Sequence, residues 1–314
     1  MATGLSLHLG INRTDPVFGM EVLGGCVNDA EAMFEIASAN GFWAGKLLDE
    51  QATFDHVKEA IEWAASVLGP GDIFLFTFAG HGTRRSINVI EPGNDEIEDQ
   101  TILLHDCVLV DNYLRRNLWT KFNDGVRVLG VMDSCHSGSV FTGVTPQPVD
   151  SSILESILFA GAGGMGTTAA EAVGAGVAVA VEAHPEIATG VAAGPQIVTP
   201  AVRGLTDAQL ANVETMRPEI HQKIRNSLEP ANTPLRAKVL SLAACQDNED
   251  AADGADHGKF TQALLDIWNG GEFKKDYRIF IDQINARVNS ASQHPTLRPE
   301  MADELFVSQR PFTI

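Results

Sequence analysis

Short apolar runs that stop abruptly at small or polar residues recur along this chain of 314 residues. Asp72–Ala79 (DIFLFTFA) is apolar at almost every position, and the stretch Val126–Gly138 (VRVLGVMDSCHSG) runs apolar until it stops at Asp133. Such runs predict strands that are buried on both faces of a parallel sheet. Leu5–Ile11, Trp43–Leu48 and Ala237–Ala244 are further apolar runs, and we expect them to form three more strands.

Segments whose apolar residues lie three and four positions apart separate these runs and predict amphipathic helices. In Cys26–Asn40 this spacing ends at Asn40-Gly41, which is a typical stop signal. Thr53 is a suitable N-cap for a second helix, which we expect to reach Leu68. Further helices are predicted over Asn112–Phe122, Asp207–Ser227, Lys259–Trp268 and Asp276–Val288.

Strands that alternate with helices in this way predict βαβ units. We therefore expect an α/β fold, a three-layer sandwich with a mostly parallel central sheet and helices on both faces. Two short stretches add detail to this expectation. Glu91–Gln100 is acidic and polar and predicts a loop, whereas Leu305–Val307 predicts a short closing strand.

The stretch Pro146–Pro200 is rich in Gly and Ala and follows neither period. A membrane helix needs about 20 clearly apolar residues, and Glu171 and Glu182 interrupt this stretch. Its composition favours a flexible insertion between two halves of one fold. We expect a single domain over residues 1–314, which comprises residues 1–145, an insertion with a helical linker over 146–235, and residues 236–314.

Composition limits the partners and the location of the protein. The formal net charge of −19 argues against nucleic acid or an anionic membrane surface as the main partner. The four cysteines are scattered, without the spacing of a zinc site, and favour a reduced, intracellular protein. The N-terminal stretch lacks the basic region and cleavage site of a signal peptide. We expect a cytoplasmic protein without a signal peptide or prodomain, and we also expect a monomer.

Two of the predicted buried strands end in residues that can carry chemistry, Gly80-His81-Gly82 and Asp133-Ser134-Cys135. Ligands of open α/β sheets bind beyond the carboxyl ends of the strands. If the two strands are neighbours, about 4.8 Å apart, His81 and Cys135 can face each other across this crevice. A thiol needs a nearby base or cation to become a nucleophile at neutral pH, and His81 can supply it. The amides of Gly82 and Cys135 are then candidates for an oxyanion hole.

Each of these residues also has an ordinary structural interpretation. A single cysteine at the end of a strand is usually a buried small hydrophobe, and a single histidine in a loop is usually solvated. His136 is a rival base, because it lies next to Cys135 in the sequence. Adjacent residues on a turn or strand generally point apart, and this favours His81.

Two motifs permit a specific comparison with a known family. Phe76–Gly82 (FTFAGHG) and Val131–Ser139 (VMDSCHSGS) resemble the histidine and cysteine motifs of the metacaspases, within the caspase-like cysteine proteases. His81 lies 54 positions before Cys135 (135 − 81), in agreement with the caspase spacing of about 50. Further matches follow in the family's order: LHLGIN, GGCVNDAEAM, DQT, SLAACQDNEDAADG and GKFTQALLDIW. The resemblance covers residues 1–145 and 236–314 and is to a compact, bacterial-type member without a prodomain.

The resemblance implies a caspase-like fold and a catalytic dyad of His81 and Cys135. It also implies cleavage of peptide bonds after Arg or Lys, with a specificity pocket lined by Cys26, Asp29 and Asp133. Carboxylates beside the nucleophile would pair with a cationic side chain and repel an anionic one. The structural alternative is that Asp29 starts a helix and Asp133 forms a turn.

Many metacaspases need calcium, and the resemblance implies Asp99 and Asp111 as candidate ligands. Asn112 and Thr142 stand where the family has two further aspartates. Calcium takes about six to eight oxygen ligands, so the loss of two carboxylates predicts a weak site or none. Nearby acidic residues could compensate or could simply form a solvated loop; they are Asp95, Glu96 and Glu98. We expect no required cofactor and keep calcium as an open alternative.

The sequence therefore predicts a cysteine endopeptidase that cleaves peptides or proteins after Arg or Lys. The family also implies processing by its own activity, and after Arg127 the next basic residue is Arg203. Candidate sites for such processing are Arg203, Arg217, Lys223, Arg225, Arg236 and Lys238. One rival is a catalytically silent caspase-like binding or signalling module, which the presence of both dyad residues disfavours. A second rival is a protease of the same fold that prefers Asp or Asn, which Asp29 and Asp133 disfavour.

Overall fold

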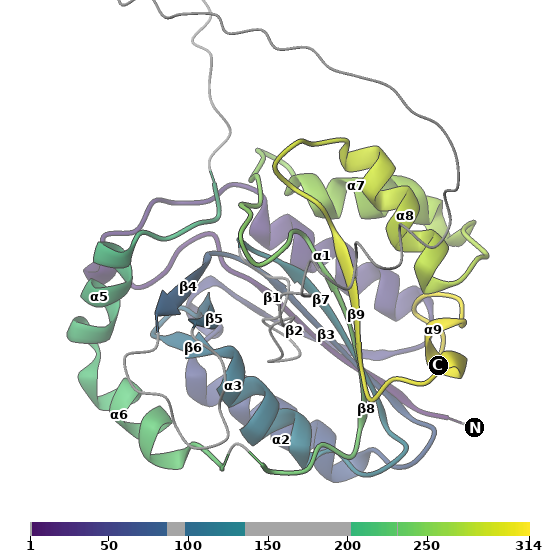
Figure 1. Cartoon of the computed structure of the whole chain (residues 1–314), viewed down its shortest axis with the longest axis horizontal. Helices are drawn as coiled ribbons and strands as arrows, with labels where there is room; N and C mark the ends of the chain where they lie inside the picture. The colour runs from purple at the N-terminus through teal and green to yellow at the C-terminus, as the bar shows by residue number, and fades with distance from the viewer. Residues whose placement is uncertain (1, 87–97, 136–201, 231) are drawn as a thin grey trace, which may run out of the picture. The chain divides into compact units, whose positions relative to one another are not determined.

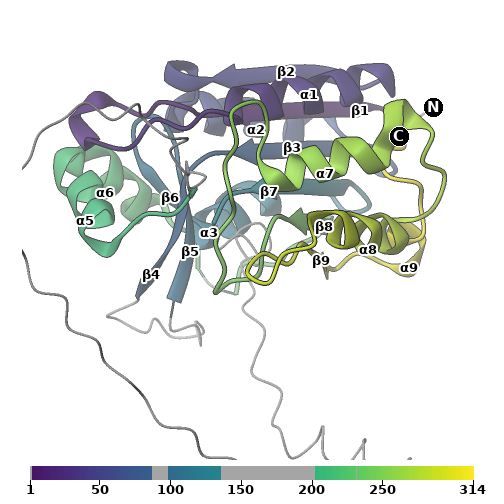
Figure 2. The ribbon, with the colours of Figure 1, turned by 90° about the horizontal axis from the view of Figure 1, so that it is seen from above.

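Strand β7 (Arg127–Asp133), which leads into Cys135, lies inside a six-stranded sheet. The computed structural model of the protein describes residues 2–86, 98–135, 202–230 and 232–314. Across the sheet the strands are, in order, β2 (Trp43–Leu48), β1 (Gly4–Gly10), β3 (Ile73–Ala79), β7, β8 (Lys238–Ala243) and β9 (Thr296–Glu300) (Figure 2). Neighbouring strands are parallel except β9, which is antiparallel to β8. The prediction of a mostly parallel sheet is confirmed.

Strand β3 is apolar at almost every position because both faces of the sheet are covered. Its alternate residues Phe74 and Phe76 belong to a buried cluster with α2 (Phe54–Val67) and α3 (Asp111–Tyr113). The helical path of α3 continues as a π-helical turn and a short 3-10 turn to Lys121, as the prediction over Asn112–Phe122 requires. The oxygen of Thr53 caps α2 by accepting a hydrogen bond from the amide of the third helical residue.

The opposite face of the sheet packs against three other helices. Ile73 and Leu75 of β3 point to this side and share a second buried cluster with them. The helices of this layer are α1 (Cys26–Ala39), α7 (Lys259–Trp268) and α8 (Tyr277–Val288). Figure 1 shows the sheet between the two helical layers, which confirms the predicted three-layer α/β sandwich.

A second, three-stranded antiparallel sheet follows β3 and was not predicted. It consists of β4 (Gly82–Ser86), β5 (Glu98–Leu103) and β6 (Val108–Val110). The predicted loop over Glu91–Gln100 is wrong at its end, because Glu98–Gln100 pair with β4. Residues 91–97 lie outside the described residues. The acidic composition of this stretch concealed the strand, since Asp and Glu are depleted in strands.

The helix predicted over Asp207–Ser227 is two helices, α5 (Asp207–Met216) and α6 (Pro218–Ser227). Pro218 has no N–H to continue α5 and instead occupies the first position of α6, where its fixed φ is favourable. Apolar side chains of α5 join Leu205 in a small cluster with residues of β5 and β6. Figure 2 shows α5, α6 and the second sheet together at one end of the main sheet.

The prediction of a closing strand at Leu305–Val307 is wrong. These residues form α9 (Glu304–Val307), and the sheet ends instead at β9. A carboxylate oxygen of Asp303 accepts a hydrogen bond from the Phe306 amide at 3.0 Å and caps the helix. Three consecutive apolar residues contain too little periodicity to distinguish a strand from a helical turn.

The contacts of the chain divide it into two units, residues 1–145 with 200–314, and residues 146–199. All the described residues belong to the first unit, and the insertion predicted over Pro146–Pro200 lies outside them. In this part of the chain no helix combines the length and the apolar character needed to cross a membrane. The four cysteines in these ranges are buried, and none of them forms a disulfide. The monomeric state and the cytoplasmic location stay predictions.

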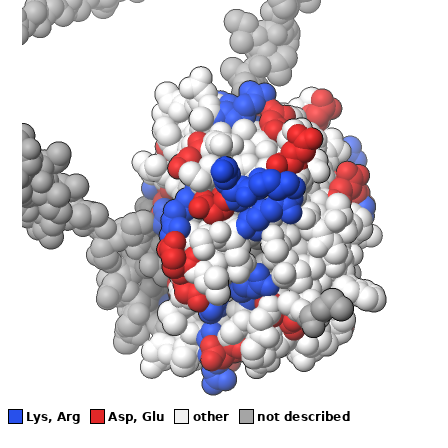
Figure 3. Space-filling model, turned by 90° about the vertical axis from the view of Figure 1, so that its right-hand side faces the viewer, with Lys and Arg blue, Asp and Glu red and all other residues white. Residues whose placement is uncertain are grey.

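The net charge of −19 does not produce a uniformly acidic surface. Figure 3 shows one face of the molecule, on which Lys and Arg side chains gather beside Asp and Glu side chains. Exposed ion pairs such as Arg278–Glu304, with 2.7 Å between the charged atoms, are part of the described surface. Pairs of this kind contribute about 0–1 kcal/mol each to stability, so the fold depends on its buried clusters instead.

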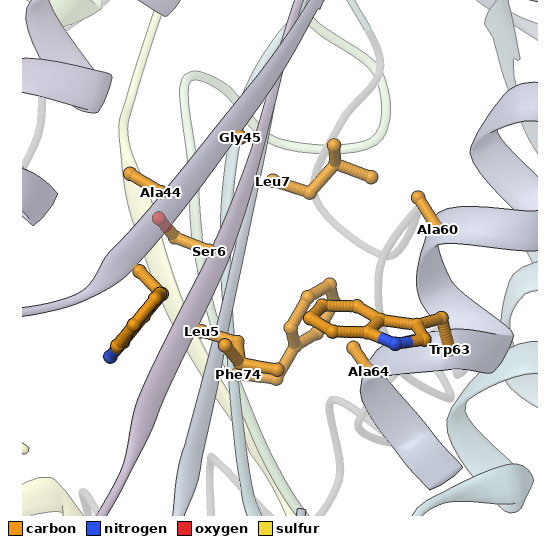
Figure 4. A pocket seen from close by; sticks show the side chains of 10 residues that line it. Leu5, Ser6, Leu7, Ala44, Gly45, Ala60, Trp63, Ala64 and Phe74 are labelled. Atoms are coloured by element: carbon orange, nitrogen blue, oxygen red, sulfur yellow. The ribbon is translucent and has the colours of Figure 1, made fainter. Parts of the chain in front are cut away.

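A cavity of about 310 Å³ lies between the sheet and α2, against the amino-terminal halves of β1 and β2. Figure 4 shows the indole of Trp63 beside the ring of Phe74 at this cavity. It contains neither His81 nor Cys135. Parallel sheets place their ligand sites at the carboxyl ends of the strands, which is the opposite end from this cavity.

Replacing Phe76 by Ala tests the assignment of the core. Phe76 is 0% exposed, and its ring centroid lies 5.5 Å from that of Trp119. We expect the free energy of unfolding to fall by about 3–5 kcal/mol, measured by urea denaturation. The control Leu305→Ala changes a residue that is 68% exposed and should cost less than about 0.5 kcal/mol. Equal losses in the two variants would contradict the assignment.

Candidate active site

The register of β3 and β7 brings the two predicted catalytic side chains to the same edge of the sheet. These strands are parallel neighbours, and Ala79 pairs with Asp133 in the last register position. His81 and Cys135 each follow two residues after that pair. The condition on which the prediction depended, that the two strands are neighbours, is therefore met.

The His81 side chain is oriented by a carbonyl group. Its Nε2 atom lies 3.0 Å from the backbone oxygen of Glu21. A carbonyl can only accept, so Nε2 carries the proton and Nδ1 is the basic nitrogen. Among the described residues Nδ1 has no hydrogen-bond partner, although it is buried. Burial lowers the pKa of His81, and the Glu21 carbonyl partly opposes this effect. The imidazole is therefore neutral at pH 7.

The thiol of Cys135 is fully buried. Its sulfur accepts a hydrogen bond from the amide of Ala251 at 3.0 Å and lies 3.6 Å from the carbonyl oxygen of the same residue. Burial raises the pKa of Cys135 well above its ordinary value, so the group is a neutral thiol in this state. A proton acceptor must be close when the sulfur attacks, as His81 would be.

Arg203 occupies the crevice beside these two side chains. It is 0% exposed, although an arginine is almost never fully buried unless it is paired. Its carbonyl oxygen accepts a hydrogen bond from the Gly82 amide at 2.9 Å, and its own amide donates to Ala251 at 3.0 Å. Its main chain is therefore held on both sides at the edge where the predicted catalytic residues lie.

Three aspartates and one carbonyl surround the Arg203 guanidinium. Nη2 donates to Asp29 at 2.6 Å and to Asp253 at 2.8 Å, and Nε donates to Asp253 at 3.2 Å. Nη1 donates to the carbonyl oxygen of Asp133 at 2.9 Å and lies 3.0 Å from its carboxylate. All three guanidinium nitrogens therefore have an acidic or carbonyl partner. We call Asp29, Asp133 and Asp253 the carboxylate pocket.

The carboxylate pocket is built at the start of α7, where unpaired helix amides favour negative charge. The Gly258 amide lies 3.2 Å from both oxygens of Asp29, and the Thr261 amide and hydroxyl donate to Asp133 at 3.1 and 2.7 Å. A side chain at position 258 would not fit, because its Cβ would lie 2.6 Å from Nη2 of Arg203. This glycine is therefore required by the pocket.

Asp253 is held by a different set of amides. The Gly24 amide donates to it at 2.7 Å and the Gly25 amide at 3.3 Å, just before α1 begins. On the other side of the pocket, Nδ1 of His257 lies 2.9 Å from Asp29, and this contact raises the pKa of His257. Backbone amides and one histidine thus offset part of the excess negative charge.

Burial and charge act in opposite directions on the ionisable groups of the pocket. Burial raises the pKa of Asp133 to about 6, although the Arg203 guanidinium opposes the rise. Burial lowers the pKa of Arg203, but Asp133 and the other acidic groups outweigh it and hold the pKa above its usual range. The guanidinium therefore stays charged, and the Asp133 carboxyl gains its proton at a higher pH than an ordinary aspartate.

The other residues predicted for the site have different surroundings. Cys26 is the first residue of α1 and is buried beside Leu23 and Ala79, and its amide donates to Asn12 at 2.9 Å. Burial raises its pKa and the Arg203 charge opposes this, which indicates that Cys26 lies near the pocket. The Gly82 amide donates to the carbonyl oxygen of Arg203 at 2.9 Å, and the oxyanion roles of the Gly82 and Cys135 amides stay predictions. The rival base His136 lies outside the described residues.

The candidate calcium ligands do not form a described site. Asp111 is buried, and its Oδ1 accepts a hydrogen bond from the amide of Asn112 at 2.6 Å. The side chain of Asp99 is outside the described part of the chain, although its backbone lies in β5. Within the described ranges no group of three or more His, Cys, Asp and Glu side chains could hold a metal. The described side chains therefore give no support to a calcium site, and calcium binding stays a prediction.

Sequence reasoning missed three parts of this site: the Asp253 carboxylate, the Glu21 carbonyl and the backbone of Ala251. A signal for Asp253 was present, because the stretch after Ala237–Ala244 contains Ala252-Asp253-Gly254. That stretch follows β8, which is the neighbour of β7 and ends at the same edge of the sheet. Glu21 and Ala251 act through backbone groups, which every residue has. The residue types therefore gave no indication of their roles.

Comparisons with known proteins agree with the geometry. The family model described as the caspase domain matches residues 3–307. Metacaspase-2 of Trypanosoma brucei brucei is 30% identical over 152 residues, which are 43% of this chain and 42% of that protein. Metacaspase-2 of Arabidopsis thaliana is 31% identical over 134 residues, which are 38% of this chain and 31% of that protein. The match thus spans less than half the length of these relatives.

A solved structure extends the similarity to the whole fold. The crystal structure of protein GSU0716 from Geobacter sulfurreducens is 29% identical in sequence, has a TM-score of 0.71, and is matched over 99% of both chains. Because the family model covers nearly the whole chain, the protein belongs to the caspase domain family. Membership of this family supports a cysteine protease as the general class of protein.

Proposed function

We propose that the protein is a cysteine endopeptidase that cleaves peptide bonds after Arg or Lys, with His81 and Cys135 as its catalytic dyad. One observation carries the proposal. A guanidinium lies in a pocket of three carboxylates, while the carbonyl of the same residue accepts a hydrogen bond from Gly82 beside the thiol. In this arrangement the pocket would bind a basic side chain. The Gly82 amide would then hold the carbonyl group of the same residue, and so the peptide bond after it, beside the thiol.

The thiol of Cys135 attacks the carbonyl carbon of the residue whose side chain fills the pocket. Nδ1 of His81, free of other partners among the described residues, takes the thiol proton and then donates it to the leaving amine. The bond from carbon to nitrogen breaks, and a thioester remains on Cys135. Water then attacks the thioester, which releases the acidic product and restores the thiol.

The Gly82 amide stabilises the negative charge that develops on the carbonyl oxygen during both attacks. Its present contact, 2.9 Å to the oxygen of Arg203, has the length expected of an oxyanion donor. A residue larger than glycine would not fit at position 82, because its Cβ would lie 2.7 Å from the carbonyl oxygen of Cys135. The Cys135 amide is the proposed second donor.

The charge of the pocket determines the specificity. Three buried carboxylates repel an aspartate side chain, and a neutral asparagine would leave them without a cation. Arginine fits better than lysine, because its planar fork supplies five donors and all three of its nitrogens are bound here. A lysine ammonium would supply three donors and a shorter reach. We therefore propose that Arg is preferred over Lys.

Fluorogenic peptides that end in Arg, Lys, Asp or Asn test this function on the full chain. We expect turnover of the Arg peptide, slower turnover of the Lys peptide, and none of the other two. Cys135→Ala and His81→Ala should lower kcat by at least about 1000-fold, because each removes a member of one catalytic unit. Asp29→Asn should lower kcat/KM for the Arg peptide by roughly 30-fold, as expected when one partner of a buried charge pair is removed.

Two substitutions serve as matched controls for this assay. Cys107→Ala removes another fully buried thiol, which lies in the core on the α2 side of the sheet. Asp55→Asn removes an exposed carboxylate that pairs with Lys223. Both controls should retain turnover of the Arg peptide. Turnover of the Asp peptide alone would contradict the specificity, and no turnover of any peptide would favour a silent binding module.

The pH dependence of the Arg peptide tests the role of Asp133. Its carboxyl has a raised pKa of about 6, so it gains a proton as the pH falls through that value and the pocket loses one negative charge. We expect KM for the Arg peptide to rise as the pH falls below about 6, whereas protonation of His81 should instead lower kcat. A KM that stays constant between pH 7 and pH 5, measured by steady-state kinetics, would contradict this role.

A further inference from the structure

We propose that residues 202–205 occupy the active site as the enzyme's own substrate, and that the bond between Arg203 and Gly204 is the one it cuts in itself. Until that cut, the Arg203 side chain excludes every other basic side chain from the pocket. This inference rests on the proposed function and adds the identity of one substrate and a form of regulation to it.

The main chain of this segment is paired on both sides in the manner of an added strand. Gly204 forms a parallel bridge with Gly82, and Val202 forms an antiparallel bridge with Ala252. Between these two bridges the backbone of Arg203 is bound to Gly82 and to Ala251. Peptides that add to a sheet edge bind through such main-chain hydrogen bonds, while pockets select their side chains.

The bond after Arg203 lies beside the nucleophile. A Cβ built on Gly204 would be 3.5 Å from the sulfur of Cys135, which is ordinary van der Waals contact. Beyond the bond, Leu205 is buried with α5, and its carbonyl oxygen accepts a hydrogen bond from the Thr83 hydroxyl at 2.9 Å. The chain is therefore anchored before and after the bond to be cut, as a substrate must be for positioned attack.

The other basic residues predicted as processing sites lack these properties. Lys223 and Arg225 lie within α6, where the backbone is already hydrogen-bonded in a helix and cannot pair with a sheet edge. Lys238 belongs to β8, whose backbone pairs with β7. Arg217 pairs with Asp15, and its side chain is 38% exposed. Among the described candidates, Arg203 is the one whose guanidinium is bound by the carboxylate pocket.

A purely structural arginine would explain the burial of the guanidinium but not the position of its carbonyl. Charge pairing alone does not require that carbonyl to meet the Gly82 amide, or the next residue to meet the thiol. A bound substrate needs its side chain in the pocket, its carbonyl at the oxyanion donor and its next residue at the nucleophile. An ion pair needs only the first of these.

The chemistry of the cut follows the proposed mechanism, with water as the second reactant. Cys135 sulfur bonds to the Arg203 carbonyl carbon, and the bond from that carbon to the Gly204 nitrogen breaks as His81 passes the thiol proton to it. Water then displaces the sulfur. The products are residues 1–203, which end in the Arg203 carboxylate, and residues 204–314, which begin with the Gly204 amine. Arg203 is then free to leave the pocket.

The experiment follows the purified full chain over time by intact mass, by sequencing of new N-termini, and by turnover of an Arg peptide. Wild type should yield a fragment that begins at Gly204, and peptide turnover should rise in step with it. Because the segment is bound within its own molecule, the rate of cutting should be unchanged by tenfold dilution. Cys135→Ala should remain a single chain.

Arg203→Gln separates occlusion from catalysis. This variant should not be cut after position 203, and before any cut its turnover of the Arg peptide should exceed that of uncut wild type by roughly tenfold or more, because its pocket is open in every molecule. Arg203→Lys keeps a cation in the pocket and should be cut more slowly than wild type. Arg225→Gln is the matched control, because it removes an exposed arginine from the same region and should be cut like wild type.

The outcomes separate this inference from the proposed function. The inference would be overturned if wild type and Arg203→Gln turned over the Arg peptide at equal rates and no fragment that begins at Gly204 appeared. That result would leave the proposed function intact. A cut after any other residue would also overturn it. The absence of both peptide turnover and cutting would overturn both. The wild-type fragment is decisive even if Arg203→Gln fails to fold.

Discussion

The burial of one guanidinium among three carboxylates is the interaction on which the rest of this site depends. A charge that leaves water is tolerated only when partners and hydrogen bonds replace its hydration. Here the partners come from three parts of the chain: Asp29 lies in the first turn of α1, Asp133 ends β7, and Asp253 lies beyond β8. The amides at the start of α7 and those of Gly24 and Gly25 complete the arrangement. Both helices and the central strands are thus tied to the pocket.

The same constraint determines the chemistry that the site can carry. Burial raises the pKa of Cys135 and lowers the pKa of His81, so in the proposed mechanism the proton moves from the thiol to the imidazole during the attack. The proposed preference for Arg rests on the carboxylate pocket, in which all three nitrogens of the Arg203 guanidinium are bound. On our proposal, Arg203 both indicates this specificity and closes the site in the intact chain.

Much of the fold could be predicted because its signals are local. The apolar runs of β3 and β7 and the helical spacing of α1 and α7 are properties of short stretches, and their bounds were close to those observed. The strand β5 was missed because its acidic residues oppose the usual strand composition, and α9 was taken for a strand because three residues carry no period. Both errors occur where local preference and tertiary pairing disagree.

The site could be predicted only in part for a related reason. His81 and Cys135 were accessible because each follows a strong strand signal, and Asp133 ends one of these strands. Asp29 lies in a helix and was indicated only by the resemblance to the metacaspases. Arg203 was one of six candidate processing sites, since nothing in its local sequence indicates burial. Its place depends on a contact with Asp29, 174 positions away, and on the order of the strands. Contacts of that kind are determined by the assembled sheet.

Thermodynamic coupling between Arg203 and Asp29 tests the central claim most directly. In a Cys135→Ala background, which keeps the chain intact, the free energy of unfolding would be measured for Arg203→Met, for Asp29→Asn and for the double variant. If the guanidinium is bound by the pocket, the double variant should lose less stability than the sum of the two single losses, by about 1–3 kcal/mol. Losses that add to within about 0.5 kcal/mol would contradict the account.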